Sequence, residues 1–280
     1  MTPRTFLGLL FAVCFSVTST SFARNPATGF LDRTVSLGGE TYRYQVFVPA
    51  NFDKTRKWPV ILFLHGYGER GGNGLLQTDV GLGHAIRNYS GTFPFVVVMP
   101  QCRSERDMTW TDAMMQKQAL AALDASIHEF HGDRSRIYLS GLSMGGYATL
   151  DFAAKYPNRF AAYVPICGGI RGPADFPQLH VALVDDPKVS DPYAETARRI
   201  GKTPVWIFHG AVDDSVPVEE SRKMAAALRA TGASVKYTEY PGVGHESWDK
   251  AYAEPGLIEW LLAQHLWSSA EDRQKIHTIL

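Results

Sequence analysis

Five short runs of apolar residues recur along the chain, and each ends in glycine, proline or a polar residue. They are WPVILFLHG (58–66), FPFVVVMPQ (93–101), SRIYLSG (135–141), FAAYVPICGG (160–169) and TPVWIFHG (203–210). Short runs that are apolar on both faces are typical of strands buried in the interior of a parallel sheet. We therefore expect the chain to fold around such a sheet.

Helical patterns lie between these runs. Residues 112–130 carry apolar side chains at intervals of three and four, and so do residues 221–232, where Gly232 supplies a C-terminal stop. Before the first run, residues 34–52 alternate apolar and polar side chains around a Gly-Gly pair, the pattern of an antiparallel hairpin. Strands that alternate with helices predict an α/β fold with right-handed crossovers.

Size and charge narrow the possible functions. The chain has 280 residues, of which 45% are hydrophobic, enough to bury one large core. Its 28 basic and 28 acidic side chains balance, so no overall field would attract nucleic acid or an anionic membrane surface. We expect no nucleic-acid partner, and other partners must be inferred from a site.

The N-terminus has the features of a secretory signal peptide. Arg4 supplies a positive charge, residues 6–17 form an apolar stretch too short to span a bilayer, and Ala23 ends a Ser-Phe-Ala triplet. We expect cleavage after Ala23, so that 1–23 is a signal peptide and 24–280 is a single mature domain. An uncleaved anchor is the alternative, and the short apolar stretch argues against it. The mature protein is then expected to be secreted or periplasmic, with no stable membrane anchor.

One junction between a strand and a helix carries a reactive side chain. Ser143 lies in the Gly-x-Ser-x-Gly motif GLSMG (141–145), directly after the run 135–141 and directly before a helical pattern over 144–156. In the nucleophile elbow of α/β-hydrolases a strained turn exposes the serine, and its neighbours are small because the backbone crosses itself closely. This context predicts an α/β-hydrolase fold, a mostly parallel eight-stranded sheet with helices on both faces, and Ser143 as the nucleophile.

A serine nucleophile needs a base and an acid. A histidine must take the hydroxyl proton, and a carboxylate must hold that histidine in the right tautomer. On this fold the order along the chain is serine, acid, histidine. Asp213 and Asp214 follow the run 203–210, at the sheet edge where catalytic groups collect. His245 follows one more strand in a glycine-rich loop, so the sequence predicts His245 as the base and one of the two aspartates as the acid.

Two backbone amides are expected to face the oxyanion of the tetrahedral intermediate. One belongs to Met144, the residue after the nucleophile, at the N-terminus of a helix. The other belongs to the loop LHGYGERGGNG (64–74), within which we choose Tyr67.

The other histidines have structural interpretations. His65 and His209 end strands immediately before glycine, where a ring can hydrogen-bond the loop backbone, and neither fits the triad order. The remaining ones fit surface or helix positions, and they are His84, His128, His131, His180, His265 and His277. No pair has convincing metal-ligand spacing, so we expect neither a metal nor another cofactor.

Several motifs together resemble those of a known enzyme group. They are FLHGYGERGGN, PQC followed by Trp110, GLSMGG, HGAVDDSVP and GVGHESW. As a set they resemble secreted esterases of the α/β-hydrolase superfamily, in particular the polyhydroxybutyrate-depolymerase-like and feruloyl-esterase-like enzymes, which have relatives described as predicted peptidases. The resemblance spans residues 35 to 265.

The resemblance assigns roles to individual residues. The group's pattern of His-Gly, two residues, Asp, two residues and Val-Pro falls on residues 209–217, which selects Asp213 over Asp214. Its glycine-histidine pattern followed by tryptophan falls on His245 and Trp248.

The resemblance also points to residues that bind substrate or brace the site. Besides Trp248 these are Trp110 and Glu69, and Glu69 fits better as a brace of the oxyanion loop than as a proton acceptor. Substrate choice is expected to depend on Tyr67 and on residues 170–203, which fit the alternation of strands and helices poorly. Residues 170–203 are either an insertion near the rim of the site or an irregular surface loop.

The sequence favours an exported serine esterase that cleaves acetyl or feruloyl esters of plant cell-wall carbohydrate through an acyl-enzyme. A secreted serine peptidase or a polyester depolymerase would use the same triad, and the fold does not decide the leaving group. A non-catalytic scaffold that binds a glycan or a protein is the third possibility. The complete set of Ser143, Asp213 and His245 argues against it.

Two cysteines, Cys102 and Cys167, remain after removal of the signal peptide. Export favours a disulfide. In the strand order of this fold, 1-2-4-3-5-6-7-8, two strands separate the ends from which they project, about 14 Å apart, whereas a disulfide needs Cα atoms within about 7 Å. We therefore expect two free thiols.

Overall fold

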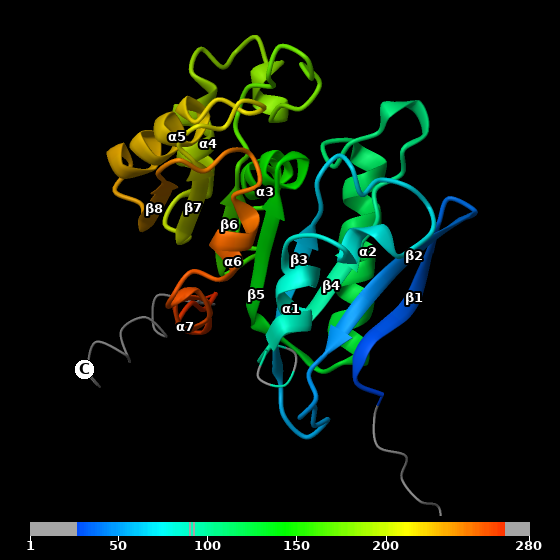
Figure 1. Ribbon diagram of the computed structural model, residues 1–280. Helices are drawn as coiled ribbons and strands as arrows, with labels where there is room; N and C mark the ends of the chain where they lie inside the picture. The colour runs from blue at the N-terminus through cyan, green and yellow to red at the C-terminus, as the bar shows by residue number, and fades with distance from the viewer. Residues whose placement is uncertain (1–26, 90, 92, 267–280) are drawn as a thin grey trace, which may run out of the picture.

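The structure is a computed structural model that describes residues 27–89, 91 and 93–266. Its centre is one eight-stranded sheet with the order β1-β2-β4-β3-β5-β6-β7-β8 (Figure 1). The strands are β1 (Gly29–Leu37), β2 (Glu40–Val48), β3 (Trp58–Leu64), β4 (Val96–Pro100), β5 (Gly132–Leu142), β6 (Ala162–Ile166), β7 (Val205–Gly210) and β8 (Val235–Tyr240). The expected α/β-hydrolase fold and its strand order are confirmed. The expected signal peptide, 1–23, lies outside the described residues.

The pairing of the strands follows the sequence patterns. β1 pairs antiparallel with β2, and β2 pairs antiparallel with β4, whereas every pair from β4-β3 to β7-β8 is parallel. The first hairpin turns through two residues, Gly38 and Gly39, with φ of 59° and 85°. Two successive positive φ angles define the tight hairpin turn that glycine favours, which explains the Gly-Gly pair.

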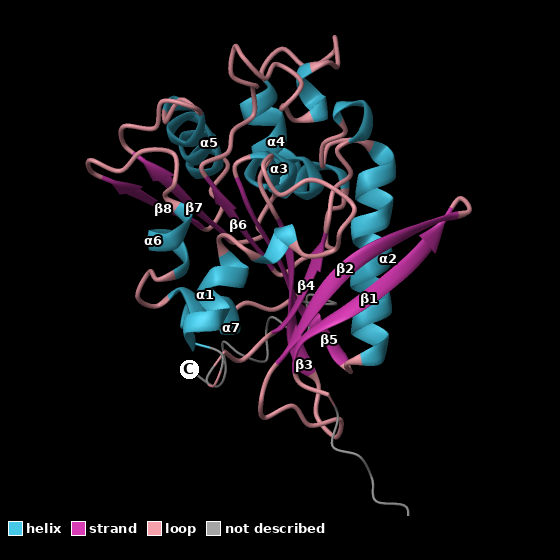
Figure 2. Cartoon of the chain, turned by 45° about the vertical axis from the view of Figure 1, so that its right-hand side comes forward, coloured by secondary structure: helices cyan, strands magenta, loops and turns pink. Residues whose placement is uncertain are grey.

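Helices cover both faces of the sheet. They are α1 (Leu82–Tyr89), α2 (Ala113–Glu129), α3 (Met144–Lys155), α4 (Pro192–Ile200), α5 (Glu219–Ala230), α6 (Trp248–Tyr252) and α7 (Leu257–Leu262), and short 3-10 turns form at Leu76–Thr78, Glu105–Asp107 and Ala182–Val184. The helices predicted at 112–130 and 221–232 are α2 and α5. Figure 2 shows α1 and α2 on opposite sides of the strands.

Alternate side chains of each central strand enter two separate cores. On β3, Val60 and Leu62 pack in the core under α2, α3, α4 and α5, whereas Ile61 and Phe63 pack in the core under α1, α6 and α7. All four are almost completely buried. Burying one such side chain stabilises the fold by about 1.5–3 kcal/mol, which is why the central runs are apolar at every position.

The cysteines lie on opposite sides of the sheet. Cys102 follows β4 and packs in the core of α2 to α5, whereas Cys167 follows β6 and packs in the core of α1, α6 and α7. Both are buried and free, as expected. Burial raises the pKa of each thiol well above its usual range, so both are uncharged at neutral pH.

Residues 170–203, which we call the rim segment, cross above the carboxyl ends of the central strands (Figure 1). The segment is irregular apart from the turn Ala182–Val184 and helix α4. Several of its apolar side chains are nevertheless buried in the core, among them Leu179, Val181 and Leu183. It is therefore a packed part of the fold rather than a loosely attached loop.

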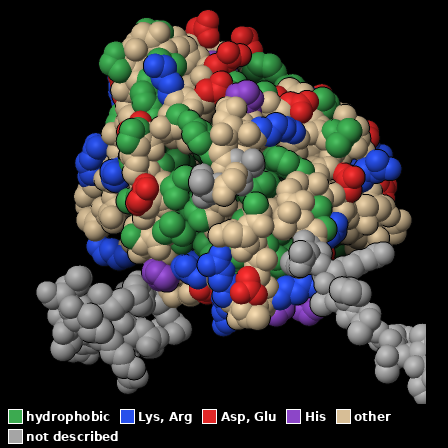
Figure 3. All heavy atoms as spheres, turned by 60° about the horizontal axis from the view of Figure 1, so that its bottom comes forward, with side chains coloured by type: hydrophobic (Ala, Val, Ile, Leu, Met, Phe, Trp, Pro, Cys, Tyr) green, Lys and Arg blue, Asp and Glu red, His purple; other side chains and the backbone are tan. Residues whose placement is uncertain are grey.

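Charged side chains of both signs are interspersed on the face that Figure 3 shows, which agrees with the balanced composition. Across the described residues, we find no helix that combines the length and the apolar character required to cross a membrane.

Candidate active site

Ser143 lies between the end of β5 and the start of α3 in a strained turn. Its φ of 52° and ψ of −116° are unusual for a residue with a side chain. Such a conformation costs about 1–3 kcal/mol and persists only where its surroundings hold it. Here the Ser143 N–H donates to Ile166 O at 2.9 Å, and the Gly146 N–H donates to Ser143 O at 2.8 Å. The turn therefore has the geometry of a nucleophile elbow, which agrees with the motif.

The glycines around Ser143 are required because backbone segments pass close to them. A Cβ atom at Gly141 would overlap the carbonyl oxygen of Gly145, and one at Gly145 would overlap the carbonyl oxygen of Leu64. One at Gly146 would overlap the backbone where β6 ends. Every added atom would meet backbone, which cannot move aside as a side chain can.

The structure brings the three expected triad residues together. His245 Nε2 lies 2.9 Å from Ser143 Oγ, and His245 Nδ1 lies 2.8 Å from Asp213 Oδ2. Asp213 comes from the loop after β7, and His245 from the loop after β8. Asp214 is exposed, and its carboxylate accepts a hydrogen bond from the Ser215 hydroxyl at 3.3 Å. The geometry therefore agrees with the choice of Asp213 over Asp214.

The Asp213 carboxylate is held in its charged form. Its side chain is completely buried, and burial by itself would raise its pKa. Hydrogen bonds from His209 and His245, and from the Val216 N–H at 2.8 Å, outweigh burial and hold the pKa below its usual range. Near neutral pH the carboxylate can therefore accept the Nδ1–H of His245 and stabilise a protonated imidazole.

One expected oxyanion donor, Met144, directly follows the nucleophile, and the other, Tyr67, directly follows Gly66, where an added Cβ atom would lie 3.7 Å from Ser143 Cβ. Met144 is the first residue of α3, and Tyr67 lies in the loop after β3. The first N–H groups of a helix have no partner within that helix and attract negative charge. Within the described part of the chain, neither amide has a protein hydrogen-bond acceptor.

Tyr67 is held by contacts on its ring and on its backbone. The Arg70 guanidinium lies 3.3 Å from the centre of the ring, and Arg70 Nε donates to Tyr67 O at 3.1 Å. The ring of Phe176, from the rim segment, lies 5.1 Å away between centroids. The rim segment therefore contacts the residue that is expected to bind the oxyanion.

Glu69 lies within the same loop, close to the nucleophile. A Cβ atom at Gly66 would lie 3.0 Å from Glu69 Oε2 and 3.7 Å from Ser143 Cβ. Burial raises the pKa of Glu69, and the negative charge of Asp79 adds to this. The side chain packs inside the loop, which agrees with the expected role as a brace.

His65 and Trp110 support the oxyanion loop from beneath. His65 Nε2 accepts the Cys102 N–H at 2.9 Å, and Nδ1 donates to Gly66 O at 2.7 Å. Burial lowers the His65 pKa to about 4, so the ring is neutral. Trp110 is fully buried and donates from Nε1 to His65 O at 3.0 Å. The structural interpretation of His65 is confirmed, and the burial and hydrogen bond of Trp110 fit a bracing role better than contact with substrate.

Trp248, the first residue of α6, contacts the expected base. Its ring lies 5.6 Å from that of His245 between centroids, and the two planes are nearly perpendicular at 88°. Edge-to-face contacts of this kind favour one ring orientation. This contact agrees with the expected role of Trp248 in bracing the site.

His209 has a contact that the sequence did not predict. Its Nε2 donates to Val216 O at 3.0 Å, as a structural histidine at a sheet edge would. The same nitrogen also lies 3.1 Å from Asp213 Oδ2. The only hint of this contact in the sequence is that His209 and Asp213 are four residues apart, a spacing at which a short turn after β7 can bring the two side chains together.

The described residues contain no group of three or more histidine, cysteine, aspartate or glutamate side chains that could hold a metal ion.

Together, the strand order, the elbow and the hydrogen-bonded serine, histidine and aspartate define an α/β-hydrolase. The pattern of the dienelactone hydrolase family matches residues 95–254, more than half of the chain. The chain belongs to the dienelactone hydrolase family.

Two individual proteins with which the chain can be aligned have low sequence identity to it. An uncharacterized secreted protein of Arthroderma benhamiae is 26% identical over 249 residues, covering 80% of this chain and 26% of that protein. Acetylxylan esterase A of Emericella nidulans is 26% identical over 156 residues, covering 52% of this chain and 49% of that enzyme. This chain thus spans about a quarter to a half of these relatives.

One solved structure, that of a thermostable esterase, superposes with a TM-score of 0.67 and is 32% identical. The match covers 84% of this chain and 63% of that one. The S-formylglutathione hydrolase FrmB from Staphylococcus aureus, at 18% identity and a TM-score of 0.63, shares the fold.

Proposed function

We propose that this protein is a serine-dependent carboxylic-ester hydrolase. The observation that carries the proposal is the continuous hydrogen-bonded series from Ser143 through His245 to Asp213, built at the carboxyl edge of the sheet. The order serine, acid, histidine along the chain is that of esterases on this fold. The 32% identity to a thermostable esterase supports the same reaction class.

In the proposed reaction Ser143 Oγ attacks the ester carbonyl carbon while His245 Nε2 takes the hydroxyl proton. The carbonyl oxygen becomes an oxyanion, which the N–H groups of Met144 and Tyr67 bind. The intermediate collapses, the proton passes from His245 to the leaving alcohol, and an acyl-enzyme remains. Water, deprotonated by the same histidine, then attacks the acyl carbon and releases the acid and free Ser143.

We propose an acetyl or feruloyl ester of plant cell-wall carbohydrate as the substrate. The similarity to an acetylxylan esterase supports an acylated polysaccharide. The exposed ring of Phe176 beside Tyr67 supports a substrate that presents an apolar or aromatic group at the rim.

We further propose export after cleavage of residues 1–23, leaving 24–280 as one domain whose rim segment is an insertion bordering the site. The similarity to a secreted protein of Arthroderma benhamiae supports export.

Labelling with a fluorophosphonate tests the nucleophile, and turnover of nitrophenyl acetate against a peptide nitroanilide tests the bond that is cleaved. We expect one label on Ser143, cleavage of the ester and none of the anilide. A protein that takes no label and cleaves neither substrate would contradict the proposal. Faster cleavage of the anilide would point to a peptidase.

A screen of acetylated xylan, methyl ferulate and short polyester oligomers then identifies the substrate class. We expect release of acetate or ferulate. Preferred release of hydroxyacids from the oligomers would replace the carbohydrate ester by a polyester.

A further inference from the structure

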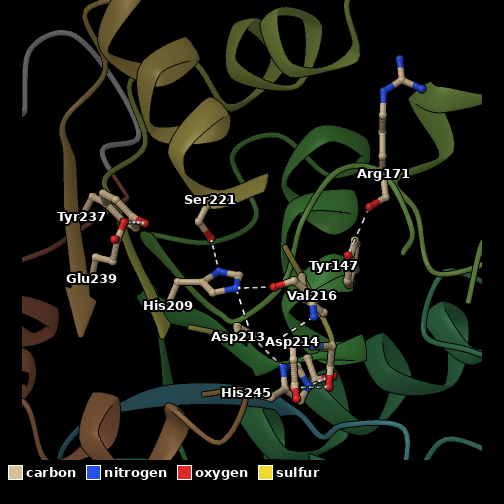
Figure 4. Close-up of polar contacts among 12 residues, drawn as sticks. Tyr147, Arg171, His209, Asp213, Asp214, Val216, Ser221, Tyr237, Glu239 and His245 are labelled. Atoms are coloured by element: carbon tan, nitrogen blue, oxygen red, sulfur yellow. Dashed lines mark hydrogen bonds and ion pairs between the residues drawn. The ribbon is translucent and has the colours of Figure 1, made fainter. Parts of the chain in front are cut away.

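A second histidine contacts the carboxylate that orients the base. Asp213 lies between the rings of His209 and His245, and both rings approach the same oxygen, Oδ2, at 3.1 and 2.8 Å (Figure 4). The other oxygen, Oδ1, accepts the N–H groups of Ser215 and Val216 at 2.9 and 2.8 Å. The position of this carboxylate is therefore determined from every side.

The partners of His209 determine where its protons lie. Nε2 faces Val216 O and Asp213 Oδ2, which can only accept, so Nε2 must carry a hydrogen. Nδ1 lies 2.7 Å from Ser221 Oγ, on helix α5. With the hydrogen on Nε2, the neutral ring accepts the Ser221 hydroxyl at Nδ1, so Ser221 holds the ring in the orientation that donates to Asp213.

The charged groups near this contact are few. Glu239 lies opposite His209 in the pairing of β7 with β8, and its hydrogen bonds to Arg222 lower its pKa to about 2. Glu220 on α5 is turned toward the amides of the rim segment. Tyr147 on α3, whose hydroxyl donates to Arg171 O, and Cys167 after β6 lie near enough to feel the charge of Asp213, and burial raises the pKa of both, so both are uncharged.

We infer that His209 is a positioning residue for the triad acid, an inference that rests on the proposed serine esterase function. The Nε2–H of His209 holds Oδ2 of Asp213 in line with His245. It also draws part of the negative charge of that oxygen away from His245. The ring touches neither the nucleophile nor any group that reacts with substrate, so it acts through Asp213 alone.

Two amide substitutions separate this role from simple packing. In His209→Gln the side-chain amide reaches the place of Nε2 and retains a donor toward Asp213. In His209→Asn the shorter amide reaches only the place of Nδ1, so the donor to Asp213 is lost. We expect kcat on nitrophenyl acetate to fall about tenfold in His209→Asn and no more than about threefold in His209→Gln, with KM within about twofold in both.

The pH profile supplies a readout that a packing defect would not move. Without the His209 donor, Asp213 attracts the protonated form of His245 more strongly. The acid limb of kcat/KM should therefore move to higher pH in His209→Asn and keep its place in His209→Gln.

The outer hydrogen bond can be tested without altering the ring. In Ser221→Ala we expect a loss of kcat of about two- to threefold, in the same direction as His209→Asn, because the ring loses the hydrogen bond that orients its Nε2–H toward Asp213. Ser126→Ala is the matched control, since Ser126 is also a buried helix serine, bonded to Ala122 O at 2.8 Å on the remote helix α2. It should leave kcat unchanged.

Equal kcat values and superimposable pH profiles for the Asn and Gln variants would overturn the inference. Ser143→Ala, assayed in parallel, tests the proposed function on its own. If Ser143→Ala is inactive while the two His209 variants are indistinguishable, the triad stands and the role of His209 does not. If Ser143→Ala retains full activity, the proposed function fails first.

Discussion

The nucleophile elbow and the rim segment border the same site, but different kinds of contact hold them. At the elbow, backbone meets backbone, and the glycines around Ser143 leave no room for a side chain. The rim segment is instead held by side chains of helices far away in the sequence. Glu220 on α5 accepts the N–H groups of Ile170 and Arg171, both at 2.9 Å, and Asp151 on α3 accepts the Ala182 N–H at 2.8 Å.

The elbow is a feature of the fold in general, whereas the contacts that hold the rim segment are particular to this chain. Backbone crossings at the elbow leave few sequences that fit, so the chemistry is tied to one motif. Side-chain contacts at the rim can be exchanged while the sheet stays intact. We therefore expect changes at the elbow to abolish turnover or folding, and changes at the rim to alter substrate binding.

The largest effect is expected at the nucleophile. Ser143→Ala and His245→Ala should each lower kcat for ester hydrolysis by about four orders of magnitude or more, because the triad acts as a unit. Circular dichroism should show an unchanged fold. Substantial turnover by Ser143→Ala would show that Ser143 is not the nucleophile.

The next effect discriminates between two neighbouring acids. Asp213→Asn should lower kcat by about two to four orders of magnitude, since an amide cannot hold the required tautomer of His245. Asp214→Asn should stay within about threefold of the parent, because its carboxylate is exposed. Steady-state kinetics of both variants provide the check, and equal losses would contradict the assignment.

Steric exclusion at the elbow predicts a loss of stability. Gly145→Ala should lower the free energy of unfolding by about 3 kcal/mol or more, because the methyl group would overlap the Leu64 carbonyl oxygen. Gly68→Ala is the matched control, because the added atom would meet open space. It should change the free energy of unfolding by less than about 0.5 kcal/mol. Urea denaturation measures both, and similar values would show that the elbow tolerates side chains.

A smaller effect is expected where the rim is anchored. Glu220→Gln removes the charged acceptor for two rim amides and for the Tyr193 hydroxyl, which lies 2.6 Å from Oε1. We expect about 1–3 kcal/mol lower stability and an increase in KM that exceeds the decrease in kcat. The neighbouring Glu219→Gln alters only an exposed pair with Arg222 and should do neither. A decrease in kcat at constant KM would instead show that Glu220 affects the chemical step rather than substrate binding.

The smallest effect is expected at the tip of the rim. Phe176→Ala should raise KM about two- to fivefold for an aryl ester such as methyl ferulate, and less for an acetyl ester, because the exposed ring beside Tyr67 can stack on the aryl group. Leu75→Ala, at an exposed apolar position outside the site, serves as the control. Equal changes for the two esters would exclude Phe176 from substrate selection.

Much of the fold was predictable because local patterns report burial. The runs that are apolar at every position became the central strands, and the Gly-Gly pair became the two-residue turn of the first hairpin. Ser143 could be found because its motif coincides with a strand and helix junction. The choice between Asp213 and Asp214 needed the resemblance to known esterases, since both follow the same strand.

The contact between His209 and the carboxylate of Asp213 could not be predicted in the same way. His65 and His209 have similar local sequences, an apolar run followed by His-Gly, and both side chains are fully buried. The ring of His65 bonds to backbone only, whereas that of His209 reaches a carboxylate. The loop that follows each strand makes the difference, and its course depends on what packs around it.

The sequence alone was enough to predict the parallel sheet and the elbow, because the sheet follows from apolar periodicity and the elbow from a short motif with a steric cause. The strand order and the chain order of the triad residues came with the fold that this motif indicates. Which side chains meet across the site depends on tertiary packing. Glu220 and Asp151 reach the rim segment, Phe176 reaches Tyr67, and His209 reaches Asp213. The first three contacts join elements far apart in the chain and form only when those elements pack together. The contact between His209 and Asp213 is short in sequence, but it depends on the course of the loop after β7, which its tertiary surroundings determine.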